Sequence, residues 1–178
     1  ESSPILHTAF LSGLKESGVH VHDIGIVPTG TMYHATHVLD VDGGVMITAS
    51  HNPPEYNGFK MNNGTAAMAG DSIQELLNTF LQSEFKMGDG SITNTEILNN
   101  HIDSVIKNID LPKRKLKVAI DCGNAVAGPA MIELFNKLNM EIVPLFCEWD
   151  NQFPNHPPDP TRIENMQHLS KAVKENNA

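Results

Sequence analysis

The sequence predicts an α/β fold with a largely parallel sheet, and the order of its segments carries that prediction. Segments whose apolar residues repeat with helical spacing alternate along the chain with short apolar or alternating segments typical of β-strands. This order is typical of βα units, in which helices connect parallel strands. A stretch rich in glycine and polar residues, 85–94, has no periodic apolar pattern, so we predict a loop there and a domain boundary beside it. The expected domains are residues 1–95 and 96–178.

In the first domain, caps and apolar spacing define the expected elements. Ser2 or Ser3 can cap a helix that begins at Pro4. Gly43 and Gly44 are expected to form a turn. The other expected elements are a strand over 19–24, a helix over 31–39, a strand over 45–48, and a helix with a capping box at 72–75, while residues 59–61 are too few to assign.

The second domain repeats the alternation of helix and strand. The expected elements are a helix with apolar residues from 97 to 106, a strand over 116–121, a helix from 129 to 138, a strand over 141–146, and a helix marked by apolar residues from 163 to 173. In an α/β layout a last helix leads back to another strand. Because the sequence stops soon after this helix, we expect it to be part of a longer protein.

The composition bounds what the chain can do. It has 178 residues, enough to bury a core in one large or two small domains, and a net charge of −9. The acidic balance argues against binding to nucleic acids or to an anionic membrane surface. No apolar run approaches the ~20 residues that a membrane-spanning helix needs. Two cysteines, Cys122 and Cys147, cannot form a disulfide framework, so we expect a reduced, cytoplasmic protein without a membrane or nucleic-acid partner.

The densest polar segment, residues 48–54, follows an apolar strand. Active-site loops of open α/β sheets lie at the carboxyl ends of strands, so this segment would present Ser50 with His51 beside it. Pro53 and Pro54 stiffen the loop because proline continues neither a helix nor a sheet. A following Asn-Gly turn would bring Lys60 back toward the loop.

Three interpretations of this segment stay open. A serine hydrolase needs a base within hydrogen-bond reach of Ser50, but adjacent side chains point apart in extended chain, and the Gly-x-Ser-x-Gly elbow is absent. A phosphoryl carrier fits better: a phosphate on Ser50 carries about −2 charge, which His51 and Lys60 could offset. A proline-stiffened polar loop without catalysis is the remaining alternative.

Other motifs carry less chemistry. Gly123 and Gly128 have the spacing of a phosphate-binding P-loop, but Pro129 and Ala130 stand where that motif requires lysine and serine or threonine, so we interpret the glycines as parts of a tight strand-to-helix turn. Two histidine pairs lack the further ligands that a zinc site needs, namely His20 with His22 and His34 with His37.

Residues 48–60, Thr-Ala-Ser-His-Asn-Pro-Pro-Glu-Tyr-Asn-Gly-Phe-Lys, resemble the phosphoserine signature of the α-D-phosphohexomutases, and most closely the phosphomannomutase/phosphoglucomutase branch. Three further segments, 24–30, 121–128 and 153–160, are similar to segments of the same family and follow in the same order. Family members have four domains, of which the first three share an α/β core. The resemblance thus implies two α/β/α domains with mixed, largely parallel sheets, covering most of the first domain and part of the second.

The resemblance also implies an activity. Such a protein is an isomerase that interconverts hexose 1-phosphate and hexose 6-phosphate, of mannose, glucose or both, by intramolecular phosphotransfer. It acts through a phosphoserine and a bound hexose 1,6-bisphosphate, which also serves as activator. Ser50 matches the phosphocarrier, while His51 and Lys60 match positions near the reacting phosphate. The full-length protein is expected to be a cytoplasmic monomer or weak dimer with a phosphorylated hexose as its substrate.

One departure from the family pattern concerns the metal. The family holds Mg²⁺ by the serine phosphate and three aspartates of an Asp-Gly-Asp-Gly-Asp-Arg loop, which is absent from these 178 residues. Ser50, through its phosphate, is then the one expected metal ligand, with the aspartates beyond the chain end. The chain alone is therefore expected to be inactive. The alternative function is a non-catalytic phosphosugar-binding relative.

Overall fold

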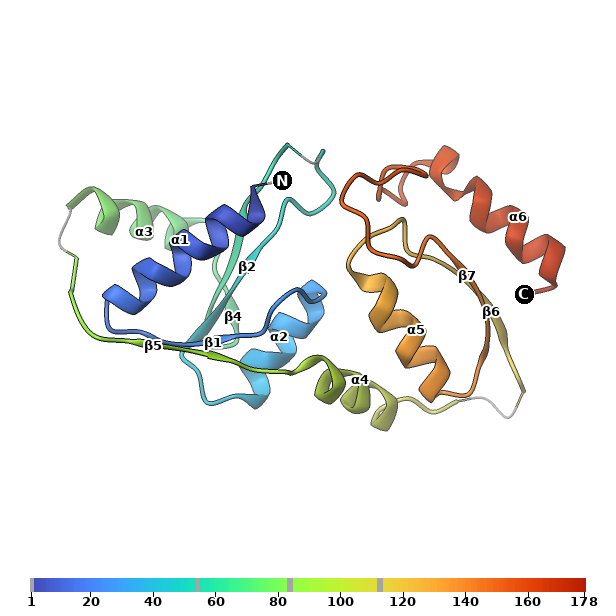
Figure 1. Ribbon diagram of the computed structural model, residues 1–178, viewed down its shortest axis with the longest axis horizontal. Helices are drawn as coiled ribbons and strands as arrows, with labels where there is room; N and C mark the ends of the chain where they lie inside the picture. The colour runs from blue at the N-terminus through green and yellow to red at the C-terminus, as the bar shows by residue number, and fades with distance from the viewer. Residues whose placement is uncertain (1, 54, 83–84, 112–113) are drawn as a thin grey trace. The chain divides into compact units, whose positions relative to one another are not determined.

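The computed structural model describes residues 2–53, 55–82, 85–111 and 114–178, and these form two compact units. The first unit comprises the chain up to Gly25 and Thr29–Ile97, and the second comprises Ile26–Pro28 and Leu98–Ala178. Pro54, one of the two prolines predicted to stiffen the polar loop, lies outside the described residues. Helices and strands alternate in both units, which confirms the predicted α/β class (Figure 1).

The first unit contains two small sheets. One pairs β1 (His20–Asp23) in parallel with β5 (Ser91–Asn94), and the other is antiparallel, in the order β2 (Gly43–Ile47), β3 (Phe59–Asn63), β4 (Ala66–Ala67). Helix α1 (Ser3–Glu16) contacts β1, β2 and β5, whereas α2 (Thr29–Val38) packs on β2. Helix α3 (Asp71–Gln82) precedes β5. The fully buried Thr31 and the neighbouring Met32 place the core of this unit on the inner face of α2.

Two predictions for the first unit are wrong. The stretch 85–94 is not all loop, because β5 forms there and runs alongside β1, with His20 paired to Ser91. All residues of β5 are exposed, so its sequence lacks the alternation of apolar and polar residues that is typical of a half-buried strand. Gly43 and Gly44 do not form a turn but begin β2. They are glycines because a Cβ on Gly43 would overlap the carbonyl oxygen of Asn62, and one on Gly44 would lie 2.7 Å from Thr36 Cγ2.

Both predicted serine caps are also wrong. Ser2 stands before α1 but makes no side-chain cap hydrogen bond. Helix α3 begins one residue before Ser72, whose hydroxyl instead exchanges hydrogen bonds of 3.0 Å with the backbone of Ala69. The carbonyl of Gly70 accepts the N–H groups of the first turn of α3.

The second unit is a parallel strand pair with a helix on each side. Strands β6 (Lys117–Asp121) and β7 (Glu141–Leu145) are joined by α5 (Ala127–Lys137), which packs on β7 and on α4 (Leu98–Lys107). A 3-10 turn, η1 (Ile163–Met166), leads into α6 (Gln167–Asn176), which packs on both strands. Figure 1 shows α5 and α6 on opposite sides of the pair. Within the described ranges of the chain, no helix is long and apolar enough to cross a membrane.

The close approach of α2 to β2 gives a testable consequence. In Gly44→Ala, the added Cβ would lie 2.7 Å from Thr36 Cγ2 and 2.9 Å from Met32 Sδ, so these buried side chains or the backbone that carries them must shift. We expect the free energy of unfolding to fall by about 1–3 kcal/mol, as for other overpacked sites, in urea titrations followed by circular dichroism.

The matched control is Gly13→Ala in α1, where an added Cβ has no neighbour within 4 Å. That variant should be unchanged or more stable by up to about 1 kcal/mol, because alanine favours a helix interior. Equal stability of Gly44→Ala and the parent protein would contradict this packing.

Candidate functional site

The polar loop predicted to carry Ser50 joins β2 to β3, and hydrogen bonds fix both of its ends. The last strand pair is Ile47 with Phe59, and beyond it the Thr48 N–H donates to the Gly58 carbonyl at 2.9 Å. The loop therefore projects from the end of an antiparallel hairpin rather than from the end of a parallel strand. The hairpin holds the base of the loop through backbone hydrogen bonds.

Ser50 is exposed and has a left-handed backbone, with φ of 58°. Non-glycine residues adopt this conformation at a cost of about 1–2 kcal/mol. The Ser50 N–H donates to Thr48 Oγ1 at 3.0 Å, which holds the backbone in place. Ser50 Oγ lies 3.3 Å from His51 Nδ1, within hydrogen-bond distance. The expectation that adjacent side chains would point apart here is wrong, because the left-handed turn at Ser50 replaces extended chain.

This contact does not complete a hydrolase-type triad. Such a triad needs a third group that orients the base. Within the described residues, the exposed His51 has no hydrogen-bond partner besides Ser50. The pair can pass a proton between the hydroxyl and the ring, but the histidine is not held as a triad base is held.

Lys60 lies at the start of β3, on the face of the hairpin that α2 covers. A side chain at Gly44 would point at Met32 and Thr36 of α2. Side chains alternate along a strand, so Met46 faces the same way, and Lys60 is its cross-strand partner. Lys60 is half-buried.

The two faces of β3 differ in what they pack against. Phe59, next to Lys60, turns the other way and contacts Phe10 of α1, with ring centroids 5.7 Å apart. Among the described residues, no ion pair engages Lys60 and no hydrogen bond joins it to Ser50 or His51. The structure thus brings Ser50 and His51 together and places Lys60 on the strand that leaves the same loop.

Asn57 is a residue of this loop whose contacts the sequence does not reveal. Its Nδ2 donates to Ser2 Oγ at 3.1 Å and to Ser3 Oγ at 2.9 Å, and its Oδ1 accepts from the Gly58 N–H at 2.9 Å. The loop is therefore tied to the start of α1. The Asn-Gly pair signals a turn, but nothing local signals a partner more than fifty residues away.

A second polar cluster lies at the carboxyl ends of β6 and β7. His156 Nε2 lies 3.1 Å from both carboxylate oxygens of Asp121, and the Gly123 N–H donates to Asp121 Oδ1 at 2.9 Å. Gly123 has a φ of 51°, and its missing Cβ leaves room for the His156 ring. A Cβ on Gly128 would overlap the carbonyl of Cys147. Both glycines thus serve the close packing of a strand-to-helix turn.

The residues present do not fit a magnesium site by themselves. Mg²⁺ prefers several hard oxygen ligands. Over residues 2–53, 55–82, 85–111 and 114–178, no three histidine, cysteine or acidic side chains cluster so that they could hold a metal ion. His20 and His22 instead contact the hydroxyls of Ser91 and Thr95, each at 2.9 Å.

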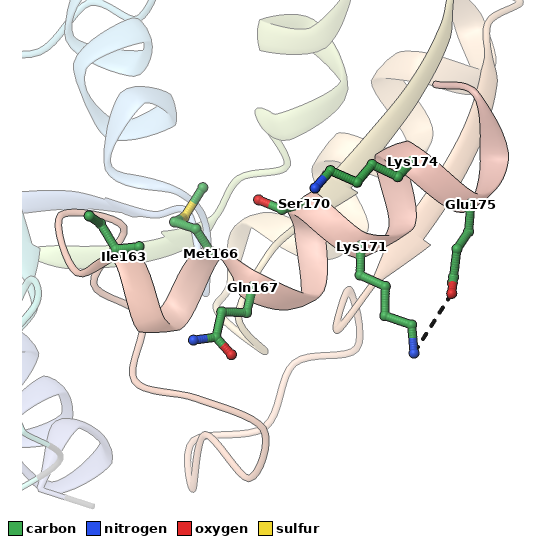
Figure 2. Close-up of a pocket in the computed structure, with 7 residues that line it drawn as sticks. All are labelled: Ile163, Met166, Gln167, Ser170, Lys171, Lys174 and Glu175. Atoms are coloured by element: carbon green, nitrogen blue, oxygen red, sulfur yellow. Dashed lines mark ion pairs between the residues drawn. The ribbon is translucent and has the colours of Figure 1, made fainter.

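An open groove runs along η1 and α6, away in sequence from the predicted residues. Figure 2 shows Ile163 and Met166 at one end and the ion pair between Lys171 and Glu175, 3.8 Å long, at the other. Ile163 is 84% exposed, so the groove is a helix surface rather than an enclosed cavity. None of the predicted site residues lines it.

Together, these features define an α/β chain that presents a serine on a loop fixed at both ends. Residues 1–87 match the family described as "Phosphoglucomutase/phosphomannomutase, alpha/beta/alpha domain I", and residues 99–178 match domain II of the same family. The chain belongs to the phosphoglucomutase/phosphomannomutase family, as the resemblance of residues 48–60 predicts.

Individual proteins to which the chain is similar support this family assignment. The chain is 41% identical over 177 residues to "Phosphomannomutase/phosphoglucomutase" of Pseudomonas putida, covering 99% of this chain and 38% of that protein. It is 43% identical over 180 residues to "Phosphoglucomutase" of Neisseria gonorrhoeae, covering 99% and 39%. A crystal structure of a phosphoglucomutase/phosphomannomutase family protein from Burkholderia thailandensis superposes with a TM-score of 0.92 at 40% identity, covering 98% of this chain and 40% of that one. The chain thus spans about two fifths of the length of these relatives.

The left-handed backbone at Ser50 can be tested by stability alone. Ser50→Gly and Ser50→Ala both remove the hydroxyl and differ in the Cβ, which disfavours a φ of 58°. We expect the glycine variant to be the more stable of the two by about 1 kcal/mol in chemical unfolding.

The same alanine–glycine comparison at residue 49 supplies the control. Ala49 has no positive φ, so Ala49→Gly should lower the free energy of unfolding by about 0.5–1 kcal/mol. If glycine destabilised position 50 as well, the left-handed assignment would be wrong.

Proposed function

We propose that the protein containing this chain is a phosphohexomutase that interconverts hexose 1-phosphate and hexose 6-phosphate, with mannose or glucose as the sugar. Ser50 carries the phosphoryl group between the two positions, and hexose 1,6-bisphosphate is the intermediate and activator. The observation that carries the proposal is the exposed Ser50 hydroxyl, 3.3 Å from His51 Nδ1, on a loop fixed at both ends. The names of the relatives support the same activity.

The loop provides what phosphoryl transfer needs from a carrier. In the first half-reaction the bond from Ser50 Oγ to phosphorus breaks, a bond from phosphorus to a sugar hydroxyl forms, and the hydroxyl proton must leave. In the second half-reaction the bond between the other phosphorus and its sugar oxygen breaks, Ser50 Oγ takes that phosphoryl group and loses its proton, and the sugar oxygen gains a proton. Transfer of this kind depends mainly on positioning and on stabilising charge. A fixed, exposed hydroxyl meets the first need.

Two side chains have roles in this proposal. His51 is placed to hold or release the proton at Ser50 Oγ, because its Nδ1 is within hydrogen-bond distance of that atom. Lys60 supplies positive charge from the strand that leaves the loop, and among the described residues no ion pair engages it. A cation near the moving phosphoryl group stabilises its transition state.

The remaining parts of the proposal concern the whole protein. Mg²⁺ would bind the Ser50 phosphate and neutralise its charge, with carboxylate ligands outside the described residues. The substrate is a phosphorylated hexose, and the protein acts in the cytoplasm as a monomer or weak dimer. The 178-residue chain alone is proposed to lack turnover.

Ser50→Ala in the full-length protein tests the carrier role. We expect the loss of the covalent phosphate on this residue and a fall in mutase turnover of at least roughly 10³-fold, as when other enzymes lose their nucleophile. The measurements are phosphopeptide mapping after incubation with hexose 1,6-bisphosphate and Mg²⁺, and an assay with hexose 1-phosphates. Ser12→Ala, an exposed serine on α1, is the control and should retain both.

Parent-like turnover by Ser50→Ala would refute the proposed carrier. If the parent protein bound hexose phosphates without ever carrying phosphate on Ser50, the non-catalytic phosphosugar-binding function would replace this one.

Lys60→Met separates charge stabilisation from the carrier itself. Methionine keeps most of the length of the half-buried side chain but removes its charge, so we expect kcat to fall roughly 10²-fold while Ser50 still accepts phosphate. Steady-state kinetics and phosphopeptide mapping on the same sample would show this split.

Lys86→Met is the control, because Lys86 is exposed and lies outside the loop. It should leave kcat unchanged. Unchanged kcat in Lys60→Met would remove Lys60 from the proposed machinery.

A further inference from the structure

Cys122 and Cys147, the two cysteines of the chain, meet in the second unit. Cys122 follows β6 directly, and Cys147 lies two residues beyond the end of β7. Their sulfur atoms are 3.5 Å apart, and both residues are half-buried. The Cys147 thiol also lies 3.3 Å from the carbonyl oxygen of Leu145.

Backbone contacts hold the two cysteines in these positions. The Cys122 N–H donates to the Leu145 carbonyl at 3.1 Å, and the Asn124 N–H donates to the Phe146 carbonyl at 2.7 Å. Gly128 lies so close to the Cys147 carbonyl that no larger residue would fit. The segments after β6 and β7 are thus fixed side by side by main-chain hydrogen bonds and packing.

We propose that Cys122 and Cys147 form a reversible intramolecular disulfide when the protein meets a two-electron oxidant of the peroxide class. A disulfide has its sulfur atoms about 2.05 Å apart, so the sulfurs must close by about 1.5 Å. In the register of β6 and β7, Cys122 falls opposite Phe146, so the two cysteines are diagonal neighbours across the pair. Rotation of the two side chains can then bring the sulfurs together. This proposal does not rest on the mutase activity.

The chemistry proceeds in two balanced steps. The Cys147 thiolate attacks a peroxide oxygen, the O–O bond breaks, and Cys147 becomes a sulfenic acid as the peroxide is reduced to one water. The Cys122 sulfur then attacks the Cys147 sulfur, the S–S bond forms, the S–O bond breaks, and a second water leaves. Overall, two thiols lose two electrons and two protons to one peroxide.

The surroundings of Cys122 favour this order of steps. Burial raises the pKa of the Cys122 thiol to about 12, with further contributions from the hydrogen bond with Cys147 and from the charges of Cys147 and Asp121. Because the thiolate is the reactive form, this shift slows the attack of Cys122 on peroxide. Oxidation of Cys147 leaves burial, the largest cause of the raised pKa, in place, so Cys122 closes the bond through its small thiolate fraction.

The disulfide would join the segments that follow β6 and β7 and close a loop through α5. Cross-linking restricts the unfolded chain, so we expect the oxidised unit to resist unfolding. For a unit of this size, we expect its melting temperature to rise by about 5 °C or more.

The test treats the full-length protein with hydrogen peroxide and maps its peptides without reduction. We expect a linked peptide pair containing Cys122 and Cys147 at every protein concentration, its release by dithiothreitol, and the rise in melting temperature. Linkage between two chains, or overoxidation of Cys147 to sulfinic acid without linkage, would overturn the proposal.

Variants test the order of attack and exclude other oxidations. Cys122→Ser should stop at a Cys147 sulfenic acid that dimedone traps, whereas Cys147→Ser should leave Cys122 unlabelled. Dimedone labelling of Cys122 instead would overturn the order. The double variant, Cys122→Ser with Cys147→Ser, controls for oxidation of the methionines and should show no rise in melting temperature on treatment.

Discussion

The antiparallel pairing of β2 with β3 is the constraint on which the candidate site depends. The pairing ends at Ile47 and Phe59, and the Thr48–Gly58 hydrogen bond closes the base of the loop. The same pairing sets which way Lys60 faces, because cross-strand partners share one face of a sheet. The hairpin can lie this close to α2 only because Gly44 has no side chain. The position of the Ser50 loop, the direction in which Lys60 faces and the packing of α2 thus all depend on the pairing of β2 with β3.

The second unit positions its polar residues by a different route. Its two strands are parallel, so their carboxyl ends lie at the same edge of the sheet. The segments that follow β6 and β7 contact each other there. Asp121 at the end of β6 holds His156, thirty-five residues further along the chain, and the His156 Nδ1 faces the Pro157 carbonyl at 2.9 Å. Phe146 packs its ring edge-on against the same histidine. A buried acid and a histidine thus bridge two loops that β6 and β7 bring together.

Local pattern predicts the elements but not their partners. The apolar runs of β6 and β7 can be recognised in the sequence because helices pack on these strands, whereas β5 is polar and exposed and is defined by its pairing with β1. The Gly43–Gly44 pair has the composition of a turn, and only the nearness of α2 and β3 makes it a strand. Similarly, the contacts of Asn57 with Ser2 and Ser3, and of Cys122 with Cys147, join residues far apart in sequence. The sequence shows that the loop contains a serine next to a histidine. Their 3.3 Å contact, however, depends on the left-handed backbone of Ser50.

That left-handed residue is the strongest structural reason to assign chemistry to the loop. A glycine would relax the backbone at position 50, yet the residue there is a serine with an exposed side chain. The hydrogen bonds from the Ser50 N–H to Thr48 and from Asn57 to the start of α1 hold the conformation against its cost. Strain that the surroundings maintain in this way is concentrated at functional sites, where it fixes a reacting group in advance. Five other described non-glycine residues share a positive φ, so the conformation supports the proposed role of the hydroxyl only together with the contact between Ser50 and His51.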